Sequence, residues 1–229
     1  MSSGSASRQS LLTVGLSSLA VDIIGLGMHG SWTALALARM GVSRLRLWDH
    51  DSVEQGNLET QAYNHYQLGM LKVGALMETI NSLVSLPPTL DGKYECYEGQ
   101  PLLPIVVSCV DTFETRRLLA TRAMHDSCQL FIETRSGGHT LLAHAFEPTE
   151  ANVQHYLDNF FPPEVASRPC GATGSIAVGF AAASLVASLL SQWKGGDGVV
   201  INEHEIVLGL SHRVTLWSMP ATTVEAAVS

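Results

Sequence analysis

The chain has 229 residues, of which 46% are hydrophobic and only 15% are charged, and its formal net charge is -8. This length suits a single α/β domain with an extensive core. So acidic a chain is a poor match for binding nucleic acid through phosphate contacts, which needs clustered Lys and Arg. Its cysteines form no C-x-x-C pair, so we expect neither structural zinc nor a disulfide framework, and a reducing cytoplasm fits. The cysteines are Cys96, Cys109, Cys128 and Cys170.

The first part of the chain predicts a βαβ unit. After a Ser-rich, flexible N-terminal arm at residues 1–10, which does not resemble a signal peptide, a β-branched run at 21–24 suits a buried parallel strand. Helix formers at 31–40 end at Gly41, a good helix stop. A second strand follows at 45–48. This order dictates a parallel sheet with a right-handed crossover.

Apolar runs and helical segments continue to alternate along the rest of the chain. The predicted elements are a helix at 73–84, a strand at 104–110, a helix at 115–124, a strand at 129–133, an antiparallel extension at 139–146, a helix at 150–157, a helix at 174–193 and two closing strands at 199–207 and 213–218. We therefore expect one domain over residues 1–229, with a Rossmann-like, mainly parallel sheet flanked by helices and extended by antiparallel strands.

Residues 174–193 carry no charge and are the stretch that most resembles a membrane span. Their many glycines, alanines and serines make them only moderately apolar, whereas a span needs about 20 strongly apolar residues. We expect a buried helix that packs closely against a sheet or another subunit, and no association with a membrane.

A glycine motif follows the first predicted strand, where residues 25–30 read G-L-G-M-H-G. In this G-x-G-x-x-G, Gly25, Gly27 and Gly30 let backbone amides approach a phosphate at a helix N-terminus, where the helix dipole favours negative charge. Asp49 ends the next strand, where an acid can bind ribose hydroxyls. The pattern predicts a nucleotide site and leaves open a nicotinamide dehydrogenase or a nucleotidyl transferase.

Four further blocks favour the transferase. They are D-H-D-S-V-E-Q-G-N-L-E-T-Q at 49–61, G-M-L-K-V at 69–73, V-D-T-F-E-T-R at 110–116 and S-R-Q at 7–9. In order and spacing they resemble the ThiF/MoeB/HesA family of ubiquitin-activating-enzyme-like adenylyltransferases, and phage- and plasmid-type ThiF proteins in particular. A dehydrogenase would also need a substrate domain, for which the sequence leaves no room.

The resemblance implies an enzyme that uses ATP and Mg²⁺ to adenylate the C-terminal carboxylate of a ubiquitin-like or sulfur-carrier protein. It implies that Lys72 binds the phosphates, that Asp111 holds the Mg²⁺ and that Arg8 is an arginine finger reaching the neighbouring subunit of a homodimer. Taken singly, an aspartate after a strand, such as Asp111, is often an N-cap for the next helix. The other residues that the resemblance places at the nucleotide are Asp49, Asp51, Asn57, Gln61 and Thr112.

One departure weakens the match, because Thr60 stands where the family often has an arginine. The missing positive charge puts the strength of ATP binding in doubt and motivates an alternative, a non-catalytic nucleotide-binding partner subunit.

Two later segments resemble phage-type relatives: F-I-E-T-R-S-G-G-H at 131–139 and P-C-G-A-T at 169–173. Cys170, ahead of a predicted helix N-terminus that would lower its pKa, is the candidate for accepting the activated carboxyl as a thioester. Its alternative is a small buried cysteine. The other three cysteines are expected to be core or incidental residues.

Overall fold

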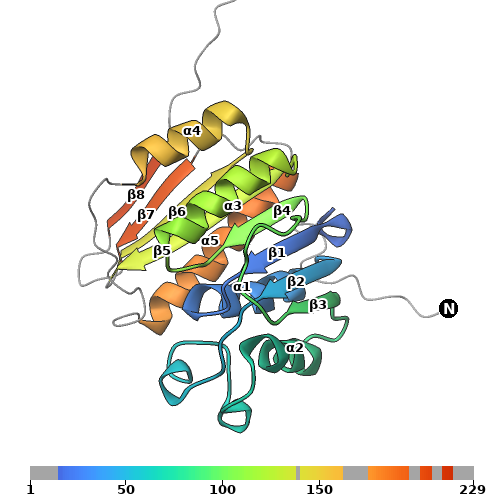
Figure 1. The fold of residues 1–229 in the computed structure, drawn as a ribbon. Helices are drawn as coiled ribbons and strands as arrows, with labels where there is room; N and C mark the ends of the chain where they lie inside the picture. Colours follow the sequence, from blue (N-terminus) through green and yellow to red (C-terminus); the bar gives the residue numbers. More distant parts are fainter. Residues whose placement is uncertain (1–14, 138–139, 162–174, 196–201, 208–212, 219–229) are drawn as a thin grey trace, which may run out of the picture.

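The structure is a computed structural model, and it describes residues 15–137, 140–161, 175–195, 202–207 and 213–218. Figure 1 shows one central sheet with helices packed on both faces. The strands are β1 (Ala20–Ile24), β2 (Arg44–Trp48), β3 (Thr89–Lys93), β4 (Ile105–Ser108), β5 (Leu130–Gly137), β6 (Thr140–Phe146), β7 (Asn202–Val207) and β8 (Arg213–Ser218). The helices are α1 (Met28–Met40), α2 (Lys72–Leu83), α3 (Phe113–His125), α4 (Glu150–Asn159) and α5 (Ile176–Lys194), with short 3-10 turns η1 (Leu16–Ser18), η2 (Gln55–Asn57) and η3 (His65–Gln67).

The sheet has eight strands in the order β3-β2-β1-β4-β5-β6-β7-β8. Pairing is parallel from β3 to β5 and antiparallel from β5 to β8, which confirms the predicted fold class. β3 differs from the expectation, which has no strand there. Its Asp91 and Gly92 are residue types depleted in strands, and it lies at the edge of the sheet, where pairing with β2 supplies the order that its sequence does not indicate.

Two apolar layers hold the helices to the sheet, because successive strand residues point to opposite faces. Val107 of β4 and Ile132 of β5 belong to the cluster that also contains residues of α1, α2 and α5. Val106 and Phe131, one position earlier on each strand, belong to the cluster beneath α3 and α4. The alternation fixes the face to which each side chain of β4 and β5 points, and so which of them reach the site described below.

Helix α5 is long and apolar enough to cross a membrane by length and composition alone, with a mean hydropathy of 1.6. Here it packs on α1 and β6, with Val178 and Ala182 against Leu141 and Met28. A Cβ at Gly179 would lie 2.9 Å from Met28 Cγ, so the missing side chain allows the two helices to approach closely. This packing supports the expected buried helix.

A buried ion pair joins β1 and β2 on the α3/α4 side of the sheet. Asp22 is fully buried and accepts hydrogen bonds from Arg46, from Trp48 Nε1 at 2.8 Å and from the Leu103 amide at 2.7 Å. Removing one partner of such a pair leaves an uncompensated charge, which is far more destabilising than the loss of an exposed pair.

We therefore expect Asp22→Asn to lower the free energy of unfolding by about 3 kcal/mol, measured by urea denaturation. The matched control is Asp91→Asn. Asp91 of β3 pairs with Arg44, which lies on β2 as Arg46 does, but this pair is more exposed, and exposed pairs contribute about 1 kcal/mol or less. An equal loss of unfolding free energy in the two variants would contradict the larger contribution that we assign to the buried pair of Asp22 and Arg46.

Candidate nucleotide-binding site

A cavity of about 840 Å³ lies at the carboxyl ends of the parallel strands. Each of the five parallel strands, or the loop directly after it, contributes to its lining. The contributing segments, in the order of the strands across the sheet, are 95–97 after β3, 48–52 at β2, 24–25 at β1, 109–112 after β4 and 134–136 on β5. From β1 the strands are added towards one edge of the sheet (β2, β3), and from β4 they are added towards the other edge (β5, β6). Open α/β sheets bind their ligands at the point between β1 and β4 where this order switches.

The three glycines of the β1–α1 loop meet three different requirements. Gly25 has a φ of +88°, and a Cβ there would lie 2.7 Å from the Cys109 carbonyl oxygen of the neighbouring strand. At Gly30 a Cβ would lie only 1.8 Å from the Gly25 carbonyl oxygen. Gly27, the N-cap of α1, faces open space instead. Gly25 and Gly30 therefore fold the loop tightly, while Gly27 leaves the N-terminus of α1 open to an anion.

Asp49 connects the glycine loop to the loop that follows β2. Its carboxylate is buried, and Oδ2 accepts a hydrogen bond of 2.7 Å from the Leu26 amide. Oδ1 accepts one of 2.8 Å from the Asp51 amide. A carboxylate has about four lone-pair sites, so two remain after these bonds. Asp49 lines the cavity, and its remaining sites suit the hydroxyls expected of a ribose.

Lys72, the first residue of α2, lies on the wall of the cavity beside Asp51. Its Nζ is 2.7 Å from Asp51 Oδ2, and the Lys72 amide donates to the Asp51 carbonyl. Burial alone would raise the pKa of Asp51, but the hydrogen bond and charge of Lys72 outweigh it and hold that pKa below its usual value. The ligand atoms of Asp49, His50 and Asp51 lie within 4.8 Å of one another. Because amides and Lys72 already engage both carboxylates, we assign no metal there.

Asp111 follows β4 and is exposed in the cavity. The N-cap of α3 is Thr112, whose Oγ1 accepts a hydrogen bond of 3.2 Å from the Thr115 amide, so the alternative role of Asp111 as a helix cap is wrong. Within the described part of the chain, the Asp111 carboxylate has no hydrogen-bond or ion-pair partner. An unengaged carboxylate beside the phosphate-binding loop fits an oxygen ligand for Mg²⁺.

Asn57 and Gln61 line the same cavity from the loop between β2 and α2. Asn57 Oδ1 accepts a hydrogen bond from the Glu54 amide, which leaves the side-chain NH₂ group for other contacts. Gln61 Oε1 is buried and has no hydrogen-bond partner within the described ranges. Thr60, between them, accepts a hydrogen bond of 2.9 Å at its carbonyl from Trp32 Nε1.

Two arginines that line the cavity near β5, Arg116 and Arg135, flank a buried carboxylate. The sequence blocks at 110–116 and 131–139 contain these residues, but no role was predicted for them. Glu133 is fully buried and binds Arg135 through Nε and Nη2, both at 2.9 Å. Arg116 Nε lies 3.0 Å from Glu133, but its N–H has no aligned acceptor, so this contact is an ion pair without a hydrogen bond. Burial opposes ionisation of Glu133, and Arg135 and Arg116 together hold its pKa below the usual value.

His29 is a second residue whose role the sequence did not reveal. It is 7% exposed, lines the cavity, and its Nδ1 lies 3.0 Å from Thr134 Oγ1. Its Nε2 is buried without a hydrogen-bond partner among the described residues. Burial, and then the positive charge of Arg116, lower the pKa of His29 to about 4. The imidazole is therefore neutral near pH 7.

Two predicted site residues, Arg8 and Cys170, lie outside the described residues. The described residues that flank residues 162–174 approach the cavity: the Phe161 ring lies 5.4 Å from the Arg135 guanidinium, and Gly179 of α5 packs on Met28. Of the other cysteines, Cys109 and Cys128 have pKa values raised to about 12, chiefly by burial, as expected of inert residues. Cys96 is exposed and lines the cavity on the side of β3.

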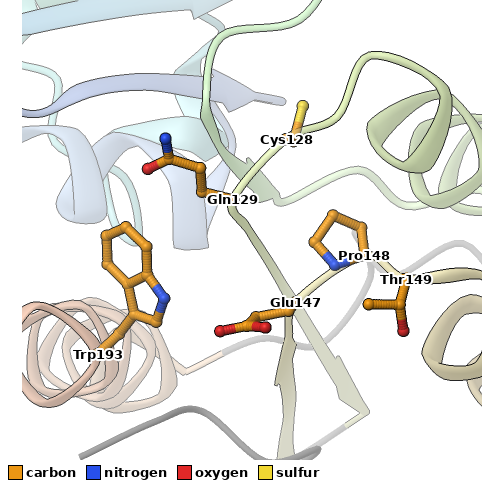
Figure 2. A pocket seen from close by; sticks show the side chains of 6 residues that line it. All are labelled: Cys128, Gln129, Glu147, Pro148, Thr149 and Trp193. Carbon is orange, nitrogen blue, oxygen red and sulfur yellow. The ribbon is translucent and has the colours of Figure 1, made fainter. Parts of the chain in front are cut away.

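A second hollow of about 380 Å³ does not compete as a nucleotide site. Figure 2 shows its lining side chains, which come from the start of β5, the segment after β6 and the end of α5. They are Cys128, Gln129, Glu147, Pro148, Thr149 and Trp193. This set contains one carboxylate and no cation, so it offers nothing to neutralise a phosphate.

The pKa of His29 predicts a pH dependence of stability. Because its folded-state pKa of about 4 lies below the unfolded value of 6.5, the unfolded chain binds more protons between pH 4 and 6.5. Stability attributable to His29 is therefore complete above pH 6.5 and falls by about 3 kcal/mol as the pH decreases to 4. Urea denaturation across this range should show that the free energy of unfolding decreases less steeply with falling pH in His29→Gln than in wild type. A free energy of unfolding that falls as steeply in His29→Gln as in wild type would contradict this assignment.

The glycine loop gives a matched pair of variants. Gly30→Ala places a Cβ 1.8 Å from a backbone oxygen, so we expect a clear fall in the thermal unfolding midpoint and loss of nucleotide binding. Gly27→Ala adds a Cβ to open space and should keep the wild-type midpoint. Similar midpoints for the two variants in thermal unfolding would refute this description of the loop.

Comparisons with known proteins agree with this geometry. The ThiF family matches residues 11–196. Ubiquitin-like modifier-activating enzyme 5 of Rattus norvegicus is 35% identical over 133 residues, which are 50% of this chain and 32% of the relative. The protein of the same name from Oryza sativa subsp. japonica is 29% identical over 132 residues, 50% of this chain and 31% of the relative. The chain thus spans about a third of the length of these curated relatives.

Solved structures share the fold. E. coli MccB with ATP has a TM-score of 0.73 at 16% identity, covering 95% of this chain and 70% of MccB. PaaA has a TM-score of 0.70 at 17% identity, covering 92% of this chain and 67% of PaaA. Since the family model matches most of the sequence, the chain belongs to the ThiF family.

Proposed function

We propose that this chain is an ATP-dependent adenylyltransferase that activates the C-terminal carboxylate of a ubiquitin-like or sulfur-carrier protein. The observation that carries the proposal is the cavity itself, which joins the glycine loop, Lys72 and the unpartnered carboxylate of Asp111 at the switch point of the sheet. The relatives named as ubiquitin-like modifier-activating enzymes and the ATP-bound structure of MccB support the same class of reaction.

In this proposal each part of the nucleotide meets a group of suitable chemistry. Asp49 accepts from the ribose hydroxyls, and the open N-terminus of α1 at Gly27 receives phosphate oxygens. The Lys72 ammonium has three N–H donors, of which Asp51 takes one, so two remain for the phosphates. Asp111 holds Mg²⁺, which when bound neutralises charge on the phosphate oxygens.

The reaction requires no proton transfer. An oxygen of the acceptor carboxylate forms a bond to the α-phosphorus, and the bond from that phosphorus to the bridging oxygen breaks. The electron pair leaves with pyrophosphate, and the product is an acyl-adenylate. Because charge builds up on the departing pyrophosphate, fixed positive groups at the phosphates lower the barrier, and a single such contact commonly contributes about 3 kcal/mol.

Four further elements belong to the proposal alone. They are a homodimer in which Arg8 reaches the partner's phosphates, transfer of the acyl group to Cys170 as a thioester, a requirement for Mg²⁺, and action in the cytoplasm. Light scattering tests the dimer, and a thiol-sensitive adduct that is absent in Cys170→Ala tests the thioester. EDTA treatment followed by re-addition of metal ions tests the metal.

We expect ATP–pyrophosphate exchange in the presence of Mg²⁺ and ubiquitin-like proteins from the same genome. Lys72→Ala and Asp111→Asn should each lower the exchange rate about a hundredfold or more. The controls are Lys93→Ala and Asp158→Asn, which change a lysine and an aspartate outside the cavity lining and should exchange at the wild-type rate.

The alternative, a non-catalytic partner subunit, is favoured by Thr60, where a cationic side chain is missing. It predicts saturable ATP binding without exchange for any acceptor. That outcome would replace the enzyme in our proposal with the partner subunit.

A further inference from the structure

The cavity has an end that the nucleotide does not need. Across the sheet, Asp49 marks the ribose position at β2, the glycine loop marks the phosphates at β1, and Asp111 follows at β4. The lining continues by one more strand, to residues 134–136 on β5. Because neighbouring strands lie about 4.8 Å apart, the end of β5 is one strand beyond Asp111 and two strands beyond the glycine loop, on the side away from Asp49.

Arg135 occupies this end and is fixed in position. Its side chain is 12% exposed and lines the cavity. Glu133 binds two of its nitrogens, the Phe160 carbonyl accepts from Nη1 at 2.8 Å, and Tyr156 Oη lies 3.4 Å from Nη2. The aromatic rings of Phe113 and Phe161 both lie within 5.5 Å of the guanidinium. A side chain held this way presents a defined donor direction and loses little entropy on binding a ligand.

The charges around Arg135 do not balance among the residues that the structure describes. Glu133 supplies one negative charge to the two positive charges of Arg116 and Arg135. His144 Nε2, 3.7 Å from Glu133, adds no negative charge in either protonation state. Among the described residues no second carboxylate pairs with either arginine. The cluster therefore carries an excess positive charge of at least one, and Arg135 is the arginine with the more exposed side chain.

One N–H donor of Arg135 remains for one oxygen of an anion. A guanidinium has five N–H donors, and the contacts above use four of them. The remaining N–H, on Nη1, has no partner among the described residues. One oxygen of a carboxylate can accept this bond while the other oxygen stays free to attack phosphorus.

We propose that Arg135 binds the carboxylate that is to be activated and holds it beside the α-phosphate. This inference rests on the proposed adenylation and assigns the acceptor end of the same cavity. The substrate class is a chain end with a free carboxylate, and a C-terminal amide is excluded because it lacks the charge. Glu133 and Arg116 are positioning residues: Glu133 orients Arg135, and Arg116 also donates to the Val110 carbonyl, next to Asp111.

The test measures equilibrium binding of acetyl-Gly-Gly with a free carboxylate to protein saturated with Mg²⁺ and AMPCPP, by calorimetry or NMR. Acetyl-Gly-Gly amide is the matched ligand. For Arg135→Gln we expect the dissociation constant of the carboxylate peptide to rise about 10- to 100-fold, since hydrogen bonds to charged groups are worth that factor. The dissociation constant of AMPCPP should remain at the wild-type value, which also shows that the variant is folded.

Arg117→Gln is the matched control, because Arg117 stacks on the same Phe161 ring at 4.5 Å but does not line the cavity. It should bind both ligands as wild type does. Arg135→Lys keeps a cation opposite buried Glu133 and decides the test if Arg135→Gln does not fold. Because lysine keeps the positive charge, we expect the dissociation constant of the peptide to rise less than in Arg135→Gln. Some rise remains, since one ammonium cannot reproduce the several N–H donors of a guanidinium, and the dissociation constant of AMPCPP should not change.

Three results would overturn the inference. They are no saturable binding of the carboxylate peptide to wild type, equal binding of the amide, or a loss of AMPCPP affinity in the Arg135 variants as large as the loss for the peptide. The last result would assign Arg135 to the phosphates. ATP–pyrophosphate exchange by the wild-type protein tests the adenylation itself. If wild type exchanges but Arg135→Gln binds the peptide as tightly as wild type does, only the role of Arg135 is refuted.

Discussion

The two hydrogen bonds accepted by Asp49 are the contacts on which the site depends. They tie the Leu26 amide of the glycine loop and the Asp51 amide of the next loop to one buried carboxylate. The loop that leads into α1 and the segment that carries the Lys72–Asp51 pair are thereby held by the two oxygens of one carboxylate. Because loops at the ends of strands have few other constraints, this carboxylate gives the nucleotide cavity a defined shape.

A second buried carboxylate has the same function three strands further across the sheet. Glu133 on β5 draws Arg116 of α3 and Arg135 towards itself, and Arg116 in turn holds the Val110 carbonyl at the end of β4. The position of Asp111 thus depends on a contact made by its neighbour Val110. Burial makes both arrangements strict, since a buried charge that loses its partner is strongly destabilising.

Sequence patterns predicted those parts of the site that are contiguous in the chain. The glycine loop has its own spacing pattern, and Lys72 at a helix start and Asp111 after a strand each lie in a contiguous block that resembles the ThiF/MoeB/HesA family. The cluster around Glu133 could not be predicted in this way, because its members come from α3 and β5 and meet only when β4 and β5 pair. β3 was missed for a similar reason, since Asp91 and Gly92 form a strand only through pairing with β2. Thr112 and Asp111 are both good N-cap residue types, and only the structure shows which one caps α3.

The electrostatics of the cavity follow from the charges that remain after internal pairing. Asp49 is engaged by amides, Asp51 by Lys72 and Glu133 by two arginines. Among the described residues, the lining carboxylates without a partner are Glu59, Glu95 and Asp111, of which Asp111 is the one at β4, and one excess positive charge remains around Arg135 at β5. A site for a cation and a site for an anion therefore lie at neighbouring strand ends, beyond the glycine loop. In the proposed reaction, a metal-bound phosphate and a reacting carboxylate would meet in this order, and Thr60, where the family often has a cation, belongs to neither of these two groups.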